Sequence, residues 1–293
     1  MTRREYKENI VVRKDLDFGL DADDIPRYWM DGDAFRTRLM DAVQATFPDG
    51  ERYFISAVRA FRDRISDPAL LQEVRDFTMQ EGQHGQVHTR YNERLRRQGI
   101  DIDAFTRHTR AMCDGRLQKR SPEYNVALTA ALEHFTAMMA DLFFAEKEVL
   151  EGADPRVRAM FAWHAIEEME HKAVAYDVMQ KIAGVGYLTR VTAMTHATLS
   201  FSLFTLVAPW IMLGMDGHSV PERVQLYRKG LGWLMGPRKG VFGRLLPMIA
   251  SYYRPGFHPN HLPTVHNYEA WVQAFATTRD TVAASEAMHH AAA

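Results

Sequence analysis

The residues best suited to metal chemistry form two Glu-x-x-His motifs, Glu81 with His84 and Glu168 with His171. On an α-helix, side chains three residues apart lie about 60° apart around the axis, so both members of a pair can reach one metal ion. His164 stands four residues before Glu168 and falls on the same helix face. The spacing therefore predicts two metal-binding helix faces, one with two ligands and one with three.

Two single acids among apolar neighbours, Glu51 and Glu133, precede the two pairs by 30 and 35 residues. This order of acids and pairs is typical of di-iron and di-manganese carboxylate bundles. Four ionised carboxylates in a dry core are costly unless they are paired, and two divalent cations would cancel their charge. The predicted metal ligands are Glu51, Glu81, His84, Glu133, His164, Glu168 and His171.

Other polar residues near these motifs receive different interpretations. His88 shares the face of Glu81, and we interpret it as a donor to a ligand or a satisfied core histidine, with an additional ligand as the remaining alternative. Glu167 either orients a ligand or is only a polar flank. Glu170 lies about 120° from His164 around the helix, so we expect it in solvent. No catalytic residue beyond the ligands is predicted.

The remaining composition narrows the kind of metal site. The single cysteine, Cys113, excludes Cys-rich zinc or iron–sulfur sites and an intramolecular disulfide framework. Carboxylate and imidazole ligands suit iron or manganese. We therefore expect two metal ions as cofactors, with iron favoured and manganese or zinc as alternatives.

Long amphipathic patterns dominate the chain, and none shows sustained β-type alternation, so we expect an all-α fold. Asp-Pro or Ser-Pro pairs, which favour helix starts, occur at residues 67, 121 and 154. The prediction is a ferritin-like four-helix bundle over residues 33–186, with additional C-terminal helices. The four predicted bundle helices cover residues 33–65 (interrupted at 48–50), 67–99, 121–152 and 154–184, with 101–119 as a connection.

Three further regions surround the predicted bundle. Residues 1–32 form an N-terminal extension, 187–253 form apolar and basic helices packed on the bundle, and 254–293 form a C-terminal extension with a frayed end. Residues 191–213 carry no Asp, Glu, Lys or Arg and are long enough to cross a bilayer. Their seven Ser, Thr and His residues favour a buried or peripheral helix, with membrane contact as the alternative.

Bulk charge and the N-terminus limit partners and location. The net charge of −1, from 36 basic and 37 acidic residues, gives no global field for nucleic acid, and we expect no nucleic-acid partner. The charged N-terminus lacks the apolar stretch of a secretory signal, so we expect a cytoplasmic protein, with membrane association as an alternative. Expected partners are a small-molecule substrate, an electron-donor protein, and further copies of the chain in a homo-oligomer.

Three stretches, FPDGERYF, EGQH and WHAIEEMEHK, resemble a bacterial family of predicted metal-dependent hydrolases with a ferritin-like bundle. The resemblance covers most of the chain and implies a metal site. The sequence is more distantly similar to the His-rich di-iron N-oxygenases that oxidise aryl amines, whose third histidine corresponds to His164. Gln80 stands where those enzymes often have Asp, so an amine substrate does not follow.

The favoured function is that of a di-iron, O2-dependent oxidase or oxygenase acting on a small, hydrophobic substrate. This preference rests on fold-level analogy, because Glu and His within a four-helix bundle are the usual setting of O2-reactive iron. A metal-dependent hydrolase that uses a metal-activated water is the first alternative. A non-enzymatic metal-binding protein is the second.

Overall fold

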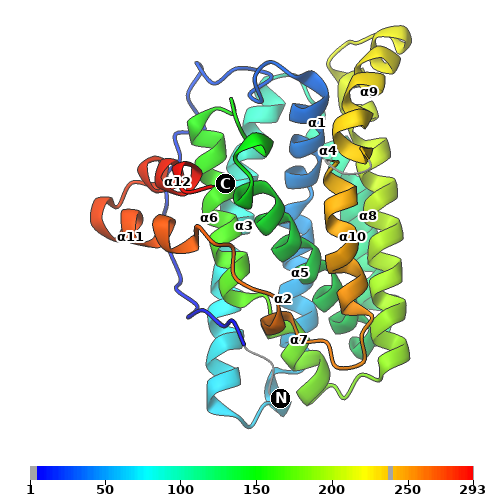
Figure 1. Ribbon diagram of the computed structural model, residues 1–293. Coiled ribbons are helices and arrows are strands. Elements are labelled where there is room, and N and C mark those ends of the chain that lie inside the picture. The colour runs from blue at the N-terminus through cyan, green and yellow to red at the C-terminus, as the bar shows by residue number, and fades with distance from the viewer. Residues whose placement is uncertain (1–4, 237–239, 293) are drawn as a thin grey trace.

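The computed structural model describes residues 5–236 and 240–292, and every regular element within them is helical apart from one isolated bridge between Met30 and Ala153. The prediction of an all-α fold is confirmed, whereas the ferritin-like assignment stays a prediction. Figure 1 shows long helices side by side, with shorter helices at their edges. The α-helices are α1 (Ala34–Ala45), α2 (Phe47–Arg59), α3 (Pro68–Arg97), α4 (Ile102–Lys119), α5 (Pro122–Ala145), α6 (Pro155–His171), α7 (Val174–Asp177), α8 (Tyr187–Met215), α9 (Val220–Met235), α10 (Val241–Tyr252), α11 (Tyr268–Thr278) and α12 (Thr281–His290).

The predicted start signals begin three of the four helices that carry the motifs. The side chains of Asp67, Ser121 and Asp154 accept hydrogen bonds from backbone N–H groups in the first turns of α3, α5 and α6, and proline follows each cap. The first predicted helix is interrupted, but at Thr46, between α1 and α2, and not at residues 48–50 as predicted. Pro48 lies in the first turn of α2, where its missing N–H group costs no hydrogen bond, so it begins a helix and does not break one. Local capping chemistry therefore fixes where these helices begin.

Four of these helices, α2, α3, α5 and α6, bring the chemistry together. α2 packs against α3 and α5, and α6 packs against α3 and α5. The single acids lie on α2 and α5, and the Glu-x-x-His pairs lie on α3 and α6. Figure 1 shows α8 and α10 on one side of these helices and α11 and α12 on the other.

Two predictions about irregular segments are wrong. Residues 101–119, predicted as a connection, form α4, which packs on α2 and buries Cys113. The C-terminal end, predicted to fray, forms α12, which packs on α6 and leaves Ala284 and Met288 fully buried. In both cases apolar residues at helical spacing pack against the bundle, and an aspartate, Asp101 or Asp280, caps the first turn.

Helix α8 lies at the periphery of the molecule (Figure 1) and exposes Leu199, Leu203 and Ile211 while its other side packs on α1 and α5. Among the described residues, α5 and α8 are long and apolar enough to span a membrane, and only 28% of the α8 window is buried against 78% for α5. Core helices of water-soluble proteins also pass this test, so membrane contact stays a prediction. Arg238 and Lys239, in the predicted basic region, lie outside the described residues.

Candidate metal centre

The seven predicted ligands, contributed by α2, α3, α5 and α6, lie together in the interior. None exposes more than 6% of its surface, and four of them are carboxylates. Three overlapping groups of three of these side chains place their donor atoms within 4.8 Å of one another, and a fourth such group joins Glu51 and His164 with His88. The ligand cluster, as we call it below, consists of Glu51, Glu81, His84, Glu133, His164, Glu168 and His171.

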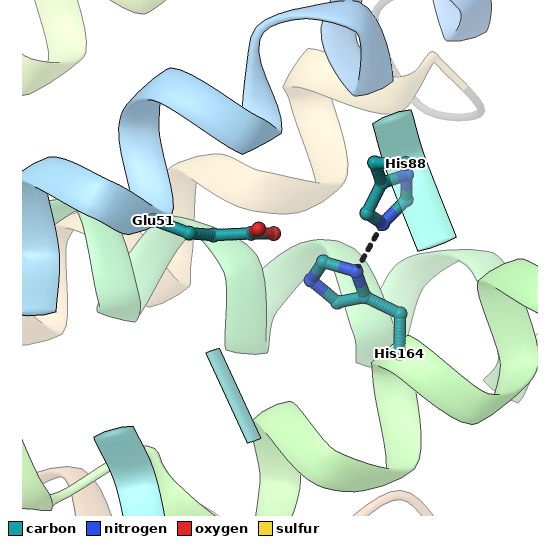
Figure 2. Close-up of side chains that lie close together, drawn as sticks. All are labelled: Glu51, His88 and His164. Carbon is teal, nitrogen blue, oxygen red and sulfur yellow. Dashed lines mark hydrogen bonds between the residues drawn. The ribbon is translucent and has the colours of Figure 1, made fainter. Parts of the chain in front are cut away.

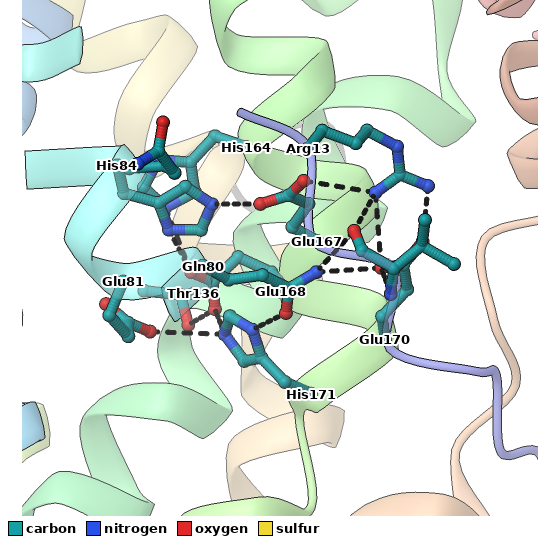
Figure 3. A network of polar contacts seen from close by, with 12 residues as sticks. Arg13, Gln80, Glu81, His84, Thr136, His164, Glu167, Glu168, Glu170 and His171 are labelled. Carbon is teal, nitrogen blue, oxygen red and sulfur yellow. Dashed lines mark hydrogen bonds and ion pairs between the residues drawn. The ribbon is translucent and has the colours of Figure 1, made fainter. Parts of the chain in front are cut away.

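One side of the ligand cluster is centred on His171. Its Nε2 lies 3.2 Å from Oε1 of Glu81, 3.3 Å from Oε2 of Glu133 and 3.4 Å from Oε2 of Glu168 (Figure 3). These acids come from three different helices. Three carboxylates and one imidazole therefore face a common point, as in a carboxylate-rich metal site.

The other side of the ligand cluster is richer in histidine. The rings of His84 and His164 stack with centroids 4.1 Å apart, and Nε2 of His164 lies 2.9 Å from Oε1 of Glu168. Glu51 reaches towards this side from α2, as Figure 2 shows. Glu168 faces both sides, which suits a carboxylate shared between two ions.

Several buried atoms of the ligand cluster form no hydrogen bond. They are both carboxylate oxygens of Glu51, Glu81 and Glu133, Nδ1 of His84 and Nε2 of His171, although Nε2 of His171 lies at ion-pair distance from Glu81 and Glu133. Such groups are costly when buried and are normally satisfied. Since carboxylate oxygens and imidazole nitrogens are metal ligands, these residues fit divalent cations at their common centre.

Burial and mutual repulsion distort the acid–base properties of the cluster. Burial first, and then the neighbouring carboxylates, raise the pKa of Glu51 and Glu133 well above the ordinary range. Burial also acts to raise the pKa of Glu168, but the positive charge of His171 beside it outweighs burial and brings this pKa well below its usual value. A bound cation would take the place of the protons that these carboxylates otherwise need.

Two polar side chains behind the ligand cluster hold the orientation of its imidazoles. Glu167 accepts a hydrogen bond from Nε2 of His84 at 3.1 Å, and Oε1 of Gln80 accepts one from Nδ1 of His171 at 2.8 Å (Figure 3). In the neutral imidazoles that bind metal, each bond would fix one tautomer and leave the lone pair of the opposite ring nitrogen facing the cluster. Arg13 donates to Glu167 at 3.1 Å and keeps that carboxylate in place.

The prediction that Glu170 lies in solvent is wrong. Glu170 is 4% exposed, and it accepts hydrogen bonds from Arg13, Gln80 and Tyr268. Arg13 comes from the N-terminal segment and Tyr268 from α11. These two segments cover the side of α6 that its helical periodicity predicts to be exposed to solvent. The motif spacing carries no signal for Arg13 or Tyr268, because both are distant in sequence.

His88 supports the histidine-rich side. Its Nδ1 lies 3.2 Å from Oε1 of Gln44, and its Nε2 lies 2.7 Å from Nδ1 of His164 (Figure 2). Because Oε1 of Gln44 can only accept, Nε2 of His88 accepts from Nδ1–H of His164. Nε2 of His164 then faces Glu168. Because His88 also lies in one of the groups of donor atoms, with Glu51 and His164, its role as a group that orients a ligand stays a prediction beside the alternative of an additional ligand.

A groove with mostly polar lining residues runs between α2 and α3 and ends at the ligand cluster. The groove has a volume of about 660 Å³, and Glu51, Glu81, Gly82 and Gly85 are among its lining residues. A Cβ atom on Gly85 would lie 3.3 Å from Oε2 of Glu51, a tight contact. Glycine therefore leaves room for this carboxylate beside the groove.

Comparison with known proteins adds a family. A family model described as "predicted metal-dependent hydrolase" matches residues 12–262, which include every residue of the ligand cluster. Comparisons with curated proteins and with solved structures find no match.

Proposed function

The chain belongs to the family of predicted metal-dependent hydrolases, and from this premise we propose that the ligand cluster binds two divalent metal ions used in a hydrolytic reaction. The observation that carries the proposal is the set of orphaned buried atoms on Glu51, Glu81, His84, Glu133 and His171. A polar core without metal would leave these atoms unsatisfied.

The donor atoms divide between two positions. Glu81, Glu133 and His171 would hold one ion, and Glu51, His84 and His164 would hold the other, with Glu168 between them. The four carboxylates and two divalent cations cancel in charge, which offsets the cost of burying the acids. When bound, a pair of divalent ions lowers the pKa of water and polarises a substrate oxygen.

The protein's own residues prepare this chemistry by fixing the donor groups. Glu167, held by Arg13, orients His84, while Gln80 orients His171. His88 orients His164. Such supporting hydrogen bonds keep ligands in position without reorganisation during the reaction. The groove between α2 and α3 supplies the water that hydrolysis consumes.

An O2-dependent oxidation is the second candidate function. It is favoured by the mixed carboxylate and imidazole ligands, which suit iron and lie in a helical bundle. This function requires redox-active metal and an electron donor, whereas hydrolysis requires neither. Iron would therefore be required for oxidation, whereas zinc or manganese would be sufficient for hydrolysis.

The two functions are distinguished by loading metal-free protein with zinc, manganese or iron(II) and testing each form. A panel of carboxyl esters, amides and phosphate esters measures hydrolysis, and anaerobic iron(II) protein mixed with O2 reports oxidation by its optical spectrum. Hydrolysis that returns with zinc or manganese and is lost in Glu133→Gln, but not in the surface variant Glu93→Gln, supports the proposal. A spectral response to O2 without hydrolysis would replace it with oxidation.

A further inference from the structure

A second opening to the ligand cluster is an apolar pocket enclosed by α2, α4, α5 and α8. Its volume is about 150 Å³, and Glu51, His164 and Glu168 form part of its wall. It differs from the polar groove in both lining and size. Much of the remaining wall is apolar, including Phe54, Cys113, Leu132, Phe135, Met139 and Phe201.

We propose that this pocket binds the substrate, and that the substrate is a small organic acid whose apolar body is about the size of one aromatic ring. The proposal rests on the proposed function and names the substrate class of the same site. An apolar cavity of roughly 150 Å³ holds a benzene molecule, so the volume favours a compact body over a long acyl chain.

The acid group is inferred from Arg116, which lines the pocket from α4. Its Nη2 donates to Nε2 of His196 at 3.2 Å, and His196 in turn contacts the hydroxyl of Tyr124 at 2.8 Å. No carboxylate among the described residues forms an ion pair with Arg116. Arg116 is half-buried, and a guanidinium whose side-chain partner is an imidazole is suited to bind a carboxylate through its remaining N–H groups.

The groove and the apolar pocket suit different reactants: the groove suits water, and the pocket suits the apolar body of the substrate. The groove between α2 and α3 reaches Glu51 and Glu81 from solvent, whereas the apolar pocket reaches Glu51, His164 and Glu168 from the side of α8. An apolar body in the pocket would exclude water from its own side of the cluster. Water would then enter through the groove, so the scissile bond and the water meet at the ligand cluster.

Calorimetric titration of the metal-loaded protein with benzoate and with benzamide, its uncharged counterpart, tests the proposal. Arg116→Gln should weaken benzoate binding about 10-fold or more and leave benzamide unchanged, because only benzoate loses a charge-assisted hydrogen bond. Cys113→Phe, which fills the pocket, should abolish binding of both probes. Arg120→Gln is the matched control, since Arg120 lies on the same helix end outside the pocket lining.

A second measurement guards against misfolding of the filled variant. Benzoate bound to the metal-loaded wild-type protein should raise its melting temperature, and this rise should be smaller in Arg116→Gln. Equal benzoate affinity in wild type and Arg116→Gln overturns the anion site. Failure of both probes to bind or to raise the melting temperature of protein that holds two metal ions overturns the pocket proposal and leaves the metal function intact. Loss of the metals themselves contradicts the proposed function instead.

Discussion

Two groups of buried charges in this protein are stabilised in different ways. Arg38 and Asp41 are fully buried, and Arg38 donates to Asp41 at 2.6 Å and to the two carboxylate oxygens of Asp216 at 2.6 and 2.7 Å. Trp29 and Tyr91 also donate to Asp41. In this arginine cluster the chain supplies the cation that its carboxylates need.

The ligand cluster has four buried carboxylates and no lysine or arginine among its members. Glu51, Glu81 and Glu133 lack hydrogen bonds, although nearby Gln80 and Glu167 are engaged. The contrast supports the proposal that metal ions supply the positive charge that the ligand cluster needs beyond His171. Acids without hydrogen bonds fit a binding site, because the acids of the arginine cluster are hydrogen-bonded.

The largest expected effect on stability comes from removing Arg38, the cation of the arginine cluster. Arg38→Leu should lower the free energy of unfolding by about 3–5 kcal/mol, because Asp41 would remain buried without a cationic partner and Asp216 would keep only the half-exposed Arg27. Urea denaturation measures this loss. Arg97→Leu is the control, since its ion pair with Asp21 is exposed and should contribute about 0–1 kcal/mol. Equal stability of the two variants would contradict the role assigned to the arginine cluster.

Removing the proposed metal ions from the ligand cluster should have the next largest effect on stability. At a free metal concentration of about 100 times the dissociation constant, binding adds roughly 2.7 kcal/mol to the free energy of unfolding, so chelation should lower the melting temperature. Glu81→Gln should reduce this dependence on metal. A melting temperature that is unchanged by chelation and by added zinc, manganese or iron(II) would show that the ligand cluster needs no cation.

A smaller effect should follow from loosening a ligand without removing it. Gln80→Leu removes the acceptor for Nδ1 of His171 and should weaken metal affinity by about 10- to 100-fold, with activity restored at high metal concentration. Titration with a competing chelator measures the change. Gln83→Leu, one turn of α3 away on an exposed hydrogen bond to the backbone of Asp15, is the control and should leave affinity unchanged.

The sequence predicts those parts of the site that depend on local helix geometry. Spacing of three and four residues brings Glu81 near His84 and His164 near Glu168, and this arrangement does not require knowledge of the tertiary fold. Caps such as Asp67 likewise identify helix starts from local chemistry. The order of the motifs along the chain predicts that Glu51 on α2 and Glu133 on α5 lie close to both Glu-x-x-His pairs.

Features that depend on distant segments could not be predicted in this way. Arg13 and Tyr268 contact Glu170 from opposite ends of the chain. A helical-wheel projection of α6 alone contains neither residue and therefore places Glu170 in solvent. Helices α4 and α12 were missed although Asp101 and Asp280 cap them, because each short amphipathic pattern gains stability only from packing on a neighbour. The missing information was therefore which distant segments of the chain pack against these helices.

The most direct test of the account is the metal content of the protein, measured by elemental analysis after loading and removal of unbound metal. The wild-type chain should hold two ions, Glu133→Gln and Glu168→Ala should each lose at least one, and Glu93→Gln should retain both. Wild-type protein without stoichiometric metal, or full occupancy in both Glu133→Gln and Glu168→Ala, would contradict the assignment of the ligand cluster as a two-metal site.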